Sequence, residues 1–394
     1  MKPSLDKHRR NFLVASAGGA AAAGLAGVVP SAFAKGKPLP GYAGWKDAER
    51  VIVHSSNTIE TVRGALGASV VTDDRVLFVR NNLPPVDMGN PDAWQVQIEG
   101  VTHPATLTVA ELKRMGLESV PMVLQCSGNG RGFFGHKASG TQWTVGAAGC
   151  SFWTGVPVKT VVARLGGVQQ GMRYMTSTGG ETLPAGIDPK TARVERSVPW
   201  AAMEQALFVW ELNGAPLPVA HGGPLRIVIP GYYGVNNVKY VQRVAFTLEQ
   251  TDANIQRSGY RVRPIGEKGA PTQPSMWEMS LKSFITSPAG DAPLAPGAVQ
   301  IHGVAFAGAS AVKGVDISLD GGASWRAASF YGPLLGPYAW RQFVFPVTLS
   351  AGTYTIASRA AGFDGALQPE LRVENERGYG HNGWRDHAVK VTVA

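Results

Sequence analysis

The chain has 394 residues, which is enough for two or three domains that each bury a hydrophobic core. Its 44% hydrophobic and 16% charged residues are typical of an ordered globular protein and exclude a disordered or fibrous one. The formal net charge of +9 favours small anions or an acidic protein as partners, whereas the lack of a Lys/Arg run interleaved with aromatic residues argues against nucleic-acid binding. The 49 glycines and 27 prolines predict many turns and more β structure than helix.

Residues 1–34 have the pattern of a twin-arginine export signal. Arg9 and Arg10 precede an Ala/Gly-rich apolar run, and residues 32–34 give a small–X–small cleavage pattern. The apolar run is weakly hydrophobic and has no strong stop-transfer flank, so we expect a cleaved signal and not a membrane anchor. The sequence therefore predicts a bacterial periplasmic protein, exported by the twin-arginine route, with no membrane span after cleavage.

The next part of the chain is predicted to carry a mixed α/β domain over residues 71–286, after an extended N-terminal arm over residues 35–70. Within this domain the patterning predicts strands at 75–79, 94–100, 120–125, 207–212 and 225–229, and helices at 108–115 and 158–165. The strand at 120–125 is apolar and leads directly into a Gly-rich loop that begins with Cys126. A rigid strand end that feeds such a loop is a common place for a reactive group.

The C-terminal part has a different pattern. Residues 287–297 are rich in Pro and Gly and are the clearest linker in the chain. Short alternating strands are then predicted at 299–306, 312–319, 325–329, 341–347 and 353–358, with a hairpin turn at Asp320-Gly321-Gly322. This spacing predicts an immunoglobulin-like β-sandwich over residues 298–394 that lacks the usual cysteine pair. The predicted fold class is therefore α+β and rich in β structure.

The two cysteines, Cys126 and Cys150, lie in different sequence contexts. Cys126 has glycines at 128 and 130 and is followed five residues later by Arg131. A guanidinium favours the ionised sulfur, and glycines let the backbone close around a bulky cofactor, so this context favours a soft thiolate ligand over a buried structural cysteine. Cys150 lies in a small apolar setting where a buried free thiol is ordinary. Neither cysteine begins a haem-attachment motif, and we expect no haem in this chain.

Six motifs in order along the chain resemble the sulfite oxidase family of molybdenum enzymes, in its bacterial sulfite dehydrogenase branch. They are Val79–Pro84, Leu124–Arg131, Glu211–Pro218, His221–Gly231, Val238–Tyr240 and Ser318–Trp325. Each motif alone is weak, but together they cover both predicted domains from about residue 70 to the end of the chain. The resemblance implies a molybdopterin-binding catalytic domain followed by a dimerisation-type domain.

The resemblance also implies roles for particular residues. Cys126 matches the protein thiolate ligand of a molybdenum that is otherwise held by a pyranopterin dithiolene, the molybdopterin cofactor. Arg80 and Arg131 match substrate-pocket arginines, whose guanidinium groups suit an oxyanion. Tyr260 matches the active-site tyrosine. The positions that bind the pterin and its phosphate are matched by His221, Arg226 and Lys239, with help from the backbone N–H of Asn237.

Several positions depart from the family pattern. Asn82 stands where many relatives have histidine, and Gly130 stands where vertebrate relatives have a second arginine. The sequence shows no counterpart of the vertebrate N-terminal haem domain, and a third substrate arginine cannot be placed in it.

The activity implied by the resemblance is the oxidation of sulfite to sulfate, with electrons passed to an external acceptor. We expect that acceptor to be a c-type cytochrome, as a separate protein or a haem subunit. Alternatives of the same fold are a sulfane dehydrogenase that acts on carrier-bound sulfur and a periplasmic sulfoxide reductase. A non-catalytic binding module is disfavoured by the combination of Cys126, Arg131 and Tyr260. The sandwich favours a homodimer slightly over a role in buttressing the catalytic domain.

Overall fold

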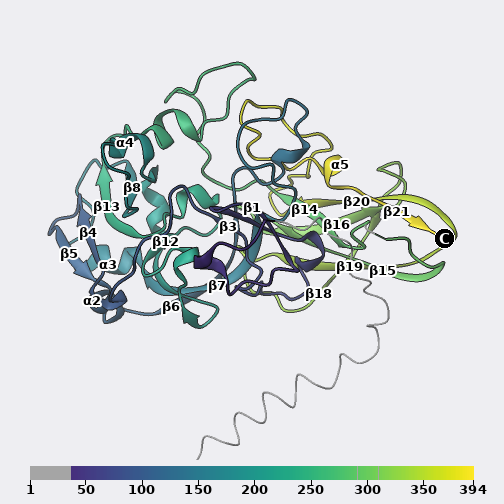
Figure 1. Cartoon of the computed structure of the whole chain (residues 1–394), viewed down its shortest axis with the longest axis horizontal. Helices are drawn as coiled ribbons and strands as arrows, with labels where there is room; N and C mark the ends of the chain where they lie inside the picture. Colours follow the sequence, from purple (N-terminus) through teal and green to yellow (C-terminus); the bar gives the residue numbers. More distant parts are fainter. Residues whose placement is uncertain (1–36, 291, 309) are drawn as a thin grey trace, which may run out of the picture. The chain divides into compact units, whose positions relative to one another are not determined.

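The computed structural model describes residues 37–290, 292–308 and 310–394 (Figure 1). The predicted export signal at residues 1–34 therefore lies outside the described residues. Across the described ranges, no helix combines the length and apolar character needed to cross a bilayer.

One part of the catalytic domain is built on a mixed five-stranded sheet of order β5-β4-β13-β8-β9. Its strands are β4 (Gln95–Glu99), β5 (Ala105–Thr108), β8 (Tyr174–Gly179), β9 (Glu195–Pro199) and β13 (Val241–Thr247). Strand β13 runs parallel to β4 and antiparallel to β8. Helix α2 (Val109–Lys113) begins at the predicted Thr cap, because the Thr108 side chain and the Glu111 side chain each bond the other's backbone N–H. Short helix α4 (Pro189–Ala192) precedes β9.

A second five-stranded sheet has the order β11-β10-β7-β6, with β12 also paired to β10. Its strands are β6 (Glu118–Gln125), β7 (Ala148–Pro157), β10 (Leu207–Leu212), β11 (Ala215–Pro216) and β12 (Arg226–Val228), and helix α3 (Val158–Arg164) follows β7. Strand β6 ends at Gln125, so the prediction that a buried strand delivers Cys126 onto a loop is confirmed. Cys150 lies opposite Val123 in this sheet, and burial raises the pKa of its thiol to about 12. Cys150 is thus an inert core residue, as expected.

The predicted N-terminal arm contains regular structure. A hairpin of β1 (Val51–Ser55) and β2 (Thr58–Thr61) pairs with the short strand β3 (Val79–Arg80). It forms because Val51, Val53 and Ile59 pack into one buried apolar cluster. Of the strand predicted at 75–79, only Val79 lies in a strand, namely β3. Residues 76 and 77 instead form a turn, in which both of their N–H groups donate to the carbonyl of Asp73.

The C-terminal part is a sandwich of two four-stranded sheets, β14-β15-β19-β18 and β17-β16-β20-β21. The first comprises β14 (Lys282–Ser287), β15 (Gly297–Phe306), β18 (Ser329–Tyr331) and β19 (Arg341–Leu349); the second comprises β16 (Val312–Ser318), β17 (Arg326–Ala327), β20 (Gly352–Gly362) and β21 (Val389–Val393). Buried side chains of both sheets form one apolar cluster. In Figure 1 these strands lie together, apart from β4, β5, β8 and β13. A mixed α/β domain followed by a β-sandwich is the predicted fold class.

Two details of the sandwich differ from the predicted pattern. Strand β14 precedes the segment 287–297 and pairs with β15, so the sandwich takes a strand from the N-terminal side of the expected linker. The single strand predicted at 325–329 is divided between β17 and β18, which belong to different sheets. The chain leaves β20 as a long segment, turns through helix α5 (Trp384–His387) and returns as β21. That segment contacts the Cys126 loop.

Candidate active site

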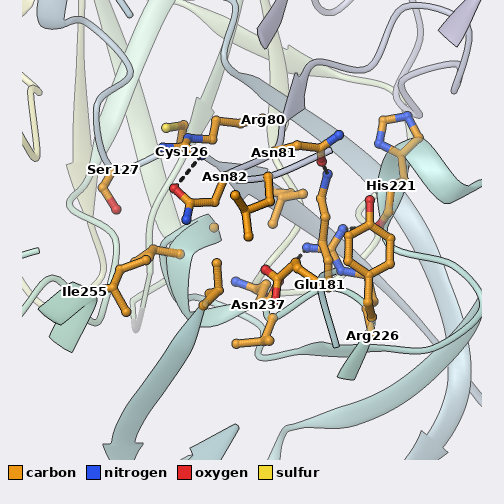
Figure 2. Close-up of a pocket in the computed structure, with 18 of the residues that line it drawn as sticks. Arg80, Asn81, Asn82, Cys126, Ser127, Glu181, His221, Arg226, Asn237 and Ile255 are labelled. Atoms are coloured by element: carbon orange, nitrogen blue, oxygen red, sulfur yellow. Dashed lines mark hydrogen bonds between the residues drawn. The ribbon is translucent and has the colours of Figure 1, made fainter. Parts of the chain in front are cut away.

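A cavity lies in the catalytic domain and is lined mainly by the ends of β3, β6 and β12 and by the loops that follow them. The lining includes all but one of the residues proposed from the sequence, namely Arg80, Cys126, His221, Arg226, Asn237, Lys239 and Tyr260. Figure 2 shows Arg80 and Cys126 close together on one side of this cavity and His221 on another. Residues from distant parts of the sequence therefore form one site.

The backbone around Cys126 is fixed by short hydrogen bonds. The Cys126 N–H donates to the carbonyl of Ala147 at 2.9 Å, and the Cys126 carbonyl accepts from the Asn129 N–H at 3.0 Å. The Asn129 amide group donates to Gln125 Oε1 at 3.1 Å and accepts from the Ala147 N–H at 3.1 Å. The Cys126 side chain is half-buried and lines the cavity. Its thiol is thus held at a rigid strand end with one side open to a ligand.

A cluster of buried cationic side chains lies at another part of the cavity. Lys239 Nζ donates to Asn81 Oδ1 and to the Ala220 carbonyl, both at 2.6 Å. Arg226 donates to the carbonyls of His221 and Asn237 at 2.6 and 2.7 Å. These partners are all neutral oxygens. The Asn237 N–H, which we expected to assist phosphate binding, donates to the Gly234 carbonyl at 3.1 Å.

Lys46 extends this cationic cluster and was not predicted as a site residue. Its buried Nζ donates to the Asp74 carbonyl at 2.6 Å and lies 3.2 Å from Nε2 of His221. Burial lowers the pKa of Lys46 to about 7 and that of Arg226 to about 9. Burial, followed by the neighbouring cations, also lowers the pKa values of Lys239 and His221 well below their ordinary values. Such a concentration of buried positive charge is unfavourable unless an anion pairs with it.

Several polar atoms at the cavity are buried and have no hydrogen-bond partner among the described residues. They are Nδ2 of Asn81, Oγ of Ser127, Oε2 of Glu181 and Nε of Arg226. Buried polar groups are nearly always paired, so a group of unpaired ones around a cavity indicates a bound ligand. Glu181 was not predicted from the sequence, and burial raises the pKa of its carboxyl to about 7. A ligand that fits this cavity carries an anionic group and further polar atoms that donate and accept hydrogen bonds.

Arg80 and Tyr260 lie on the Cys126 side of the cavity. Arg80 ends β3, and its Nη1 donates to Asn82 Oδ1 at 3.4 Å. The nearby Tyr260 phenol, followed by the Cys126 thiol, raises the pKa of Arg80 against the opposing effect of burial. Tyr260 follows directly after the single π-helical turn η8 (Ile255–Gly259). The Asn82 side-chain amide donates to the Ala192 carbonyl at 2.6 Å.

Of the site residues predicted from the sequence, Arg131 is the one that does not line the cavity. Its Nε donates to the Arg377 carbonyl at 2.8 Å, and its Nη1 donates to the Thr141 carbonyl at 3.1 Å. The buried guanidinium occupies space left by two glycines, because a Cβ atom added at Gly128 or Gly140 would lie 2.4 or 2.6 Å from it. Arg131 therefore lies outside the lining of this cavity, and its contact with the substrate stays a prediction.

Arg131 instead faces a loop of the C-terminal part. Its guanidinium lies 5.3 Å from the centre of the Tyr379 ring, and the Arg377 guanidinium lies 5.9 Å from the same ring. The buried Nε of Arg377 has no hydrogen-bond partner among the described residues. No motif indicated Tyr379 or Arg377, because they lie far from the catalytic motifs along the chain.

Comparisons with known proteins agree with this geometry. The chain matches the family described as "Oxidoreductase molybdopterin binding domain" over residues 82–255 and the one described as "Mo-co oxidoreductase dimerisation domain" over residues 273–394. It is 30% identical over 351 residues to mitochondrial sulfite oxidase of Homo sapiens, covering 84% of this chain and 63% of that protein. It is 29% identical over 336 residues to sulfite oxidase of Gallus gallus, covering 81% of this chain and 73% of that protein.

The crystal structure of the sulfane dehydrogenase SoxCD from Paracoccus pantotrophus is similar, with a TM-score of 0.73 and 25% identity over 87% of this chain and 88% of that chain. These matches show that the chain has a molybdopterin-binding domain followed by a Mo-co dimerisation domain. The chain belongs to the sulfite oxidase family of molybdenum enzymes. It spans about 63% of the length of the mammalian mitochondrial sulfite oxidases that it matches.

The residues at the cavity fit the molybdopterin cofactor. Cys126 offers a soft thiol of the kind that molybdenum accepts as a ligand. Lys46, Arg226 and Lys239 supply the charge that a phosphate group needs, and such a group would pair the buried cations. The unpaired carboxyl oxygen of Glu181 is an acceptor for an N–H group of the ligand. The fit rests on complementary charge and on hydrogen-bonding atoms that the protein leaves unpaired.

Proposed function

We propose that this protein oxidises sulfite to sulfate at a molybdenum centre bound through Cys126, and that it passes the electrons to a c-type cytochrome. The proposal is carried by the position of the Arg80 guanidinium and the Tyr260 phenol, which line the same cavity as Cys126 and interact with each other. A guanidinium binds an oxyanion through paired, charge-assisted hydrogen bonds. Sulfite and water give sulfate, two protons and two electrons, so one turnover reduces two one-electron haem acceptors.

The chain's own residues bind and orient the substrate. Arg80 offsets the negative charge of sulfite, and its hydrogen bond to Asn82 restricts rotation of the guanidinium. The phenol of Tyr260 is available to hydrogen-bond a substrate oxygen. Apolar side chains in the lining, among them Phe78 and Leu124, limit the access of bulk water. The bound cofactor supplies the oxygen-transfer and two-electron redox chemistry.

The test is reduction of cytochrome c by the molybdenum-loaded protein with sulfite as the only electron donor. We expect sulfite-dependent reduction, with one sulfate formed for every two haems reduced. A loaded protein that leaves sulfite unchanged with cytochrome c and also with ferricyanide contradicts the proposal. Oxidation of a reduced dye that depends on an added sulfoxide would instead indicate a sulfoxide reductase of the same fold.

A second candidate is a sulfane dehydrogenase that acts on carrier-bound sulfur. It is favoured by the similarity to the sulfane dehydrogenase structure, which covers most of both chains. A competition experiment distinguishes the two candidate functions. In it, the molybdenum-loaded protein receives both sulfite and a carrier protein that bears a cysteine persulfide. Oxidation of the persulfide with no turnover of free sulfite would favour the second candidate.

We also propose that the protein is periplasmic and exported by the twin-arginine route, on the strength of Arg9, Arg10 and the cleavage pattern at residues 32–34. Replacing both arginines by lysine should retain the protein in the cytoplasm with its signal uncleaved. Unchanged export of this variant through the twin-arginine route would contradict the assignment.

The assembly that we propose is a homodimer, supported by the match of residues 273–394 to a dimerisation domain. Sedimentation of the mature chain should give a dimer mass. A monomer at micromolar concentration would leave the sandwich with a buttressing role only.

A further inference from the structure

A loop of the C-terminal part, Asn375–His381, packs against the loop that carries Cys126. The Gly380 N–H donates to the carbonyl of Ser127, the residue after Cys126, at 2.9 Å. The loop is itself held in shape by Asn375, whose side chain accepts from the Tyr379 N–H and donates to the Tyr379 carbonyl, both at 2.9 Å. Tyr379 is therefore fixed at both of its backbone groups beside the catalytic domain.

The Tyr379 ring stacks on the ring of Tyr260. The ring centres are 5.0 Å apart, and the planes differ by 11°. Each ring also lies against a guanidinium: Arg131 is 5.3 Å from the Tyr379 ring, and Arg196 is 5.7 Å from the Tyr260 ring. Stacked rings and ring–cation contacts are both favourable, and here they join in one continuous row. The row runs from the Cys126 loop to the wall of the cavity.

The two tyrosines have different surroundings. Tyr260 lines the cavity and interacts with Arg80, whereas Tyr379 is buried and outside the lining. Tyr260 follows a single π-helical turn, and its ring packs against the buried apolar cluster that includes Tyr379. Arg196 is anchored separately, since it donates to the Ile255 carbonyl at 2.9 Å and to Ser275 Oγ at 2.9 Å. The stack and Arg196 together fix the direction of the Tyr260 phenol.

We propose that Tyr379 is a positioning residue that holds the Tyr260 ring beside Arg80. The activity part of this proposal rests on the proposed sulfite oxidation. It places a determinant of the active site in the C-terminal part of the chain.

The contact requires an aromatic ring at position 379 and not a hydroxyl group. In Tyr379→Leu, kcat for sulfite should fall about tenfold, whereas KM should change by less than about threefold because Arg80 is intact. Tyr379→Phe keeps the ring and should retain most of the activity. Equal losses in the two variants, or an unchanged Tyr379→Leu, would overturn the proposal.

A double variant tests whether Tyr379 acts through Tyr260. In a Tyr260→Phe background, where the phenol hydroxyl is gone, Tyr379→Leu should cause little further loss of kcat. If the two losses multiply, Tyr379 acts independently of Tyr260, and the proposal is wrong.

A measurement without turnover separates this proposal from the proposed function. Hydrogen exchange of the cofactor-free protein should become faster in residues 255–261 in Tyr379→Leu and remain unchanged in Tyr379→Phe. The matched control is Tyr354→Leu in strand β20, which should leave residues 255–261 unchanged. If Tyr379→Leu leaves that exchange unchanged, the positioning role is refuted whether or not the protein oxidises sulfite.

Discussion

Gly130 gives a quantitative test of how the Cys126 loop packs against the C-terminal part. Its φ angle is +94°, and a Cβ atom added there would lie 2.6 Å from Cγ of His381. An L-residue in this left-handed region costs roughly 1–2 kcal/mol, and overpacking against a buried ring costs about 1–3 kcal/mol more. Gly130→Ala should therefore lower the free energy of unfolding by about 2–5 kcal/mol.

Urea denaturation of the cofactor-free protein measures this change, with Gly135→Ala as the matched control in the same segment. A Cβ atom at Gly135 meets nothing within 4 Å, so this variant should stay within about 0.5 kcal/mol of the parent or be slightly more stable. If Gly130→Ala were as stable as Gly135→Ala, the packing of His381 against the loop would be refuted.

Three further predictions concern the cavity. Cys126→Ser should fold and lose sulfite oxidation, whereas Cys150→Ser should remain largely active; equal loss in both would contradict the ligand assignment. Arg80→Met should lower kcat/KM by at least about tenfold, mostly through KM for sulfite, because a charge-assisted hydrogen bond is lost; unchanged kinetics would exclude Arg80 from the substrate site. Lys46 has a pKa near 7 in the cofactor-free protein and is protonated below that pH, so binding of sulfate by this form should weaken as the pH rises through 7. Calorimetry from pH 6 to 8 tests this sign, and Lys46→Met should weaken the binding and reduce its pH dependence.

The parts of the site that the sequence predicted lie within short motifs. Leu124–Arg131 places a thiol at the end of an apolar strand, and both the strand and the loop can be seen from residue order alone. His221, Arg226 and Lys239 belong to motifs that follow one another closely, so their convergence was also predictable. The fold class could be predicted from the alternation of apolar and polar residues and from the turn residues, since both reflect local backbone geometry.

The remaining features depend on tertiary contacts that residue order does not encode. Lys46 and Glu181 are single residues outside any motif, and only the folded chain brings Glu181 to the cavity and Lys46 against His221. The direction of Arg131 depends on the positive φ angle of Gly130 and on a loop from the other domain, so the motif identified the residue but not its contacts. Strand β14 belongs to the sandwich because it pairs with β15. The Pro/Gly-rich segment between the two strands gives no indication of this pairing.

The central claim is that Cys126 provides a sulfur ligand to molybdenum. X-ray absorption at the molybdenum edge tests it most directly, by comparison of the loaded parent protein with loaded Cys126→Ser. We expect the Cys126→Ser variant to lose one sulfur neighbour of the metal, whereas Cys150→Ser should keep the parent spectrum. An unchanged number of sulfur neighbours in Cys126→Ser would contradict it.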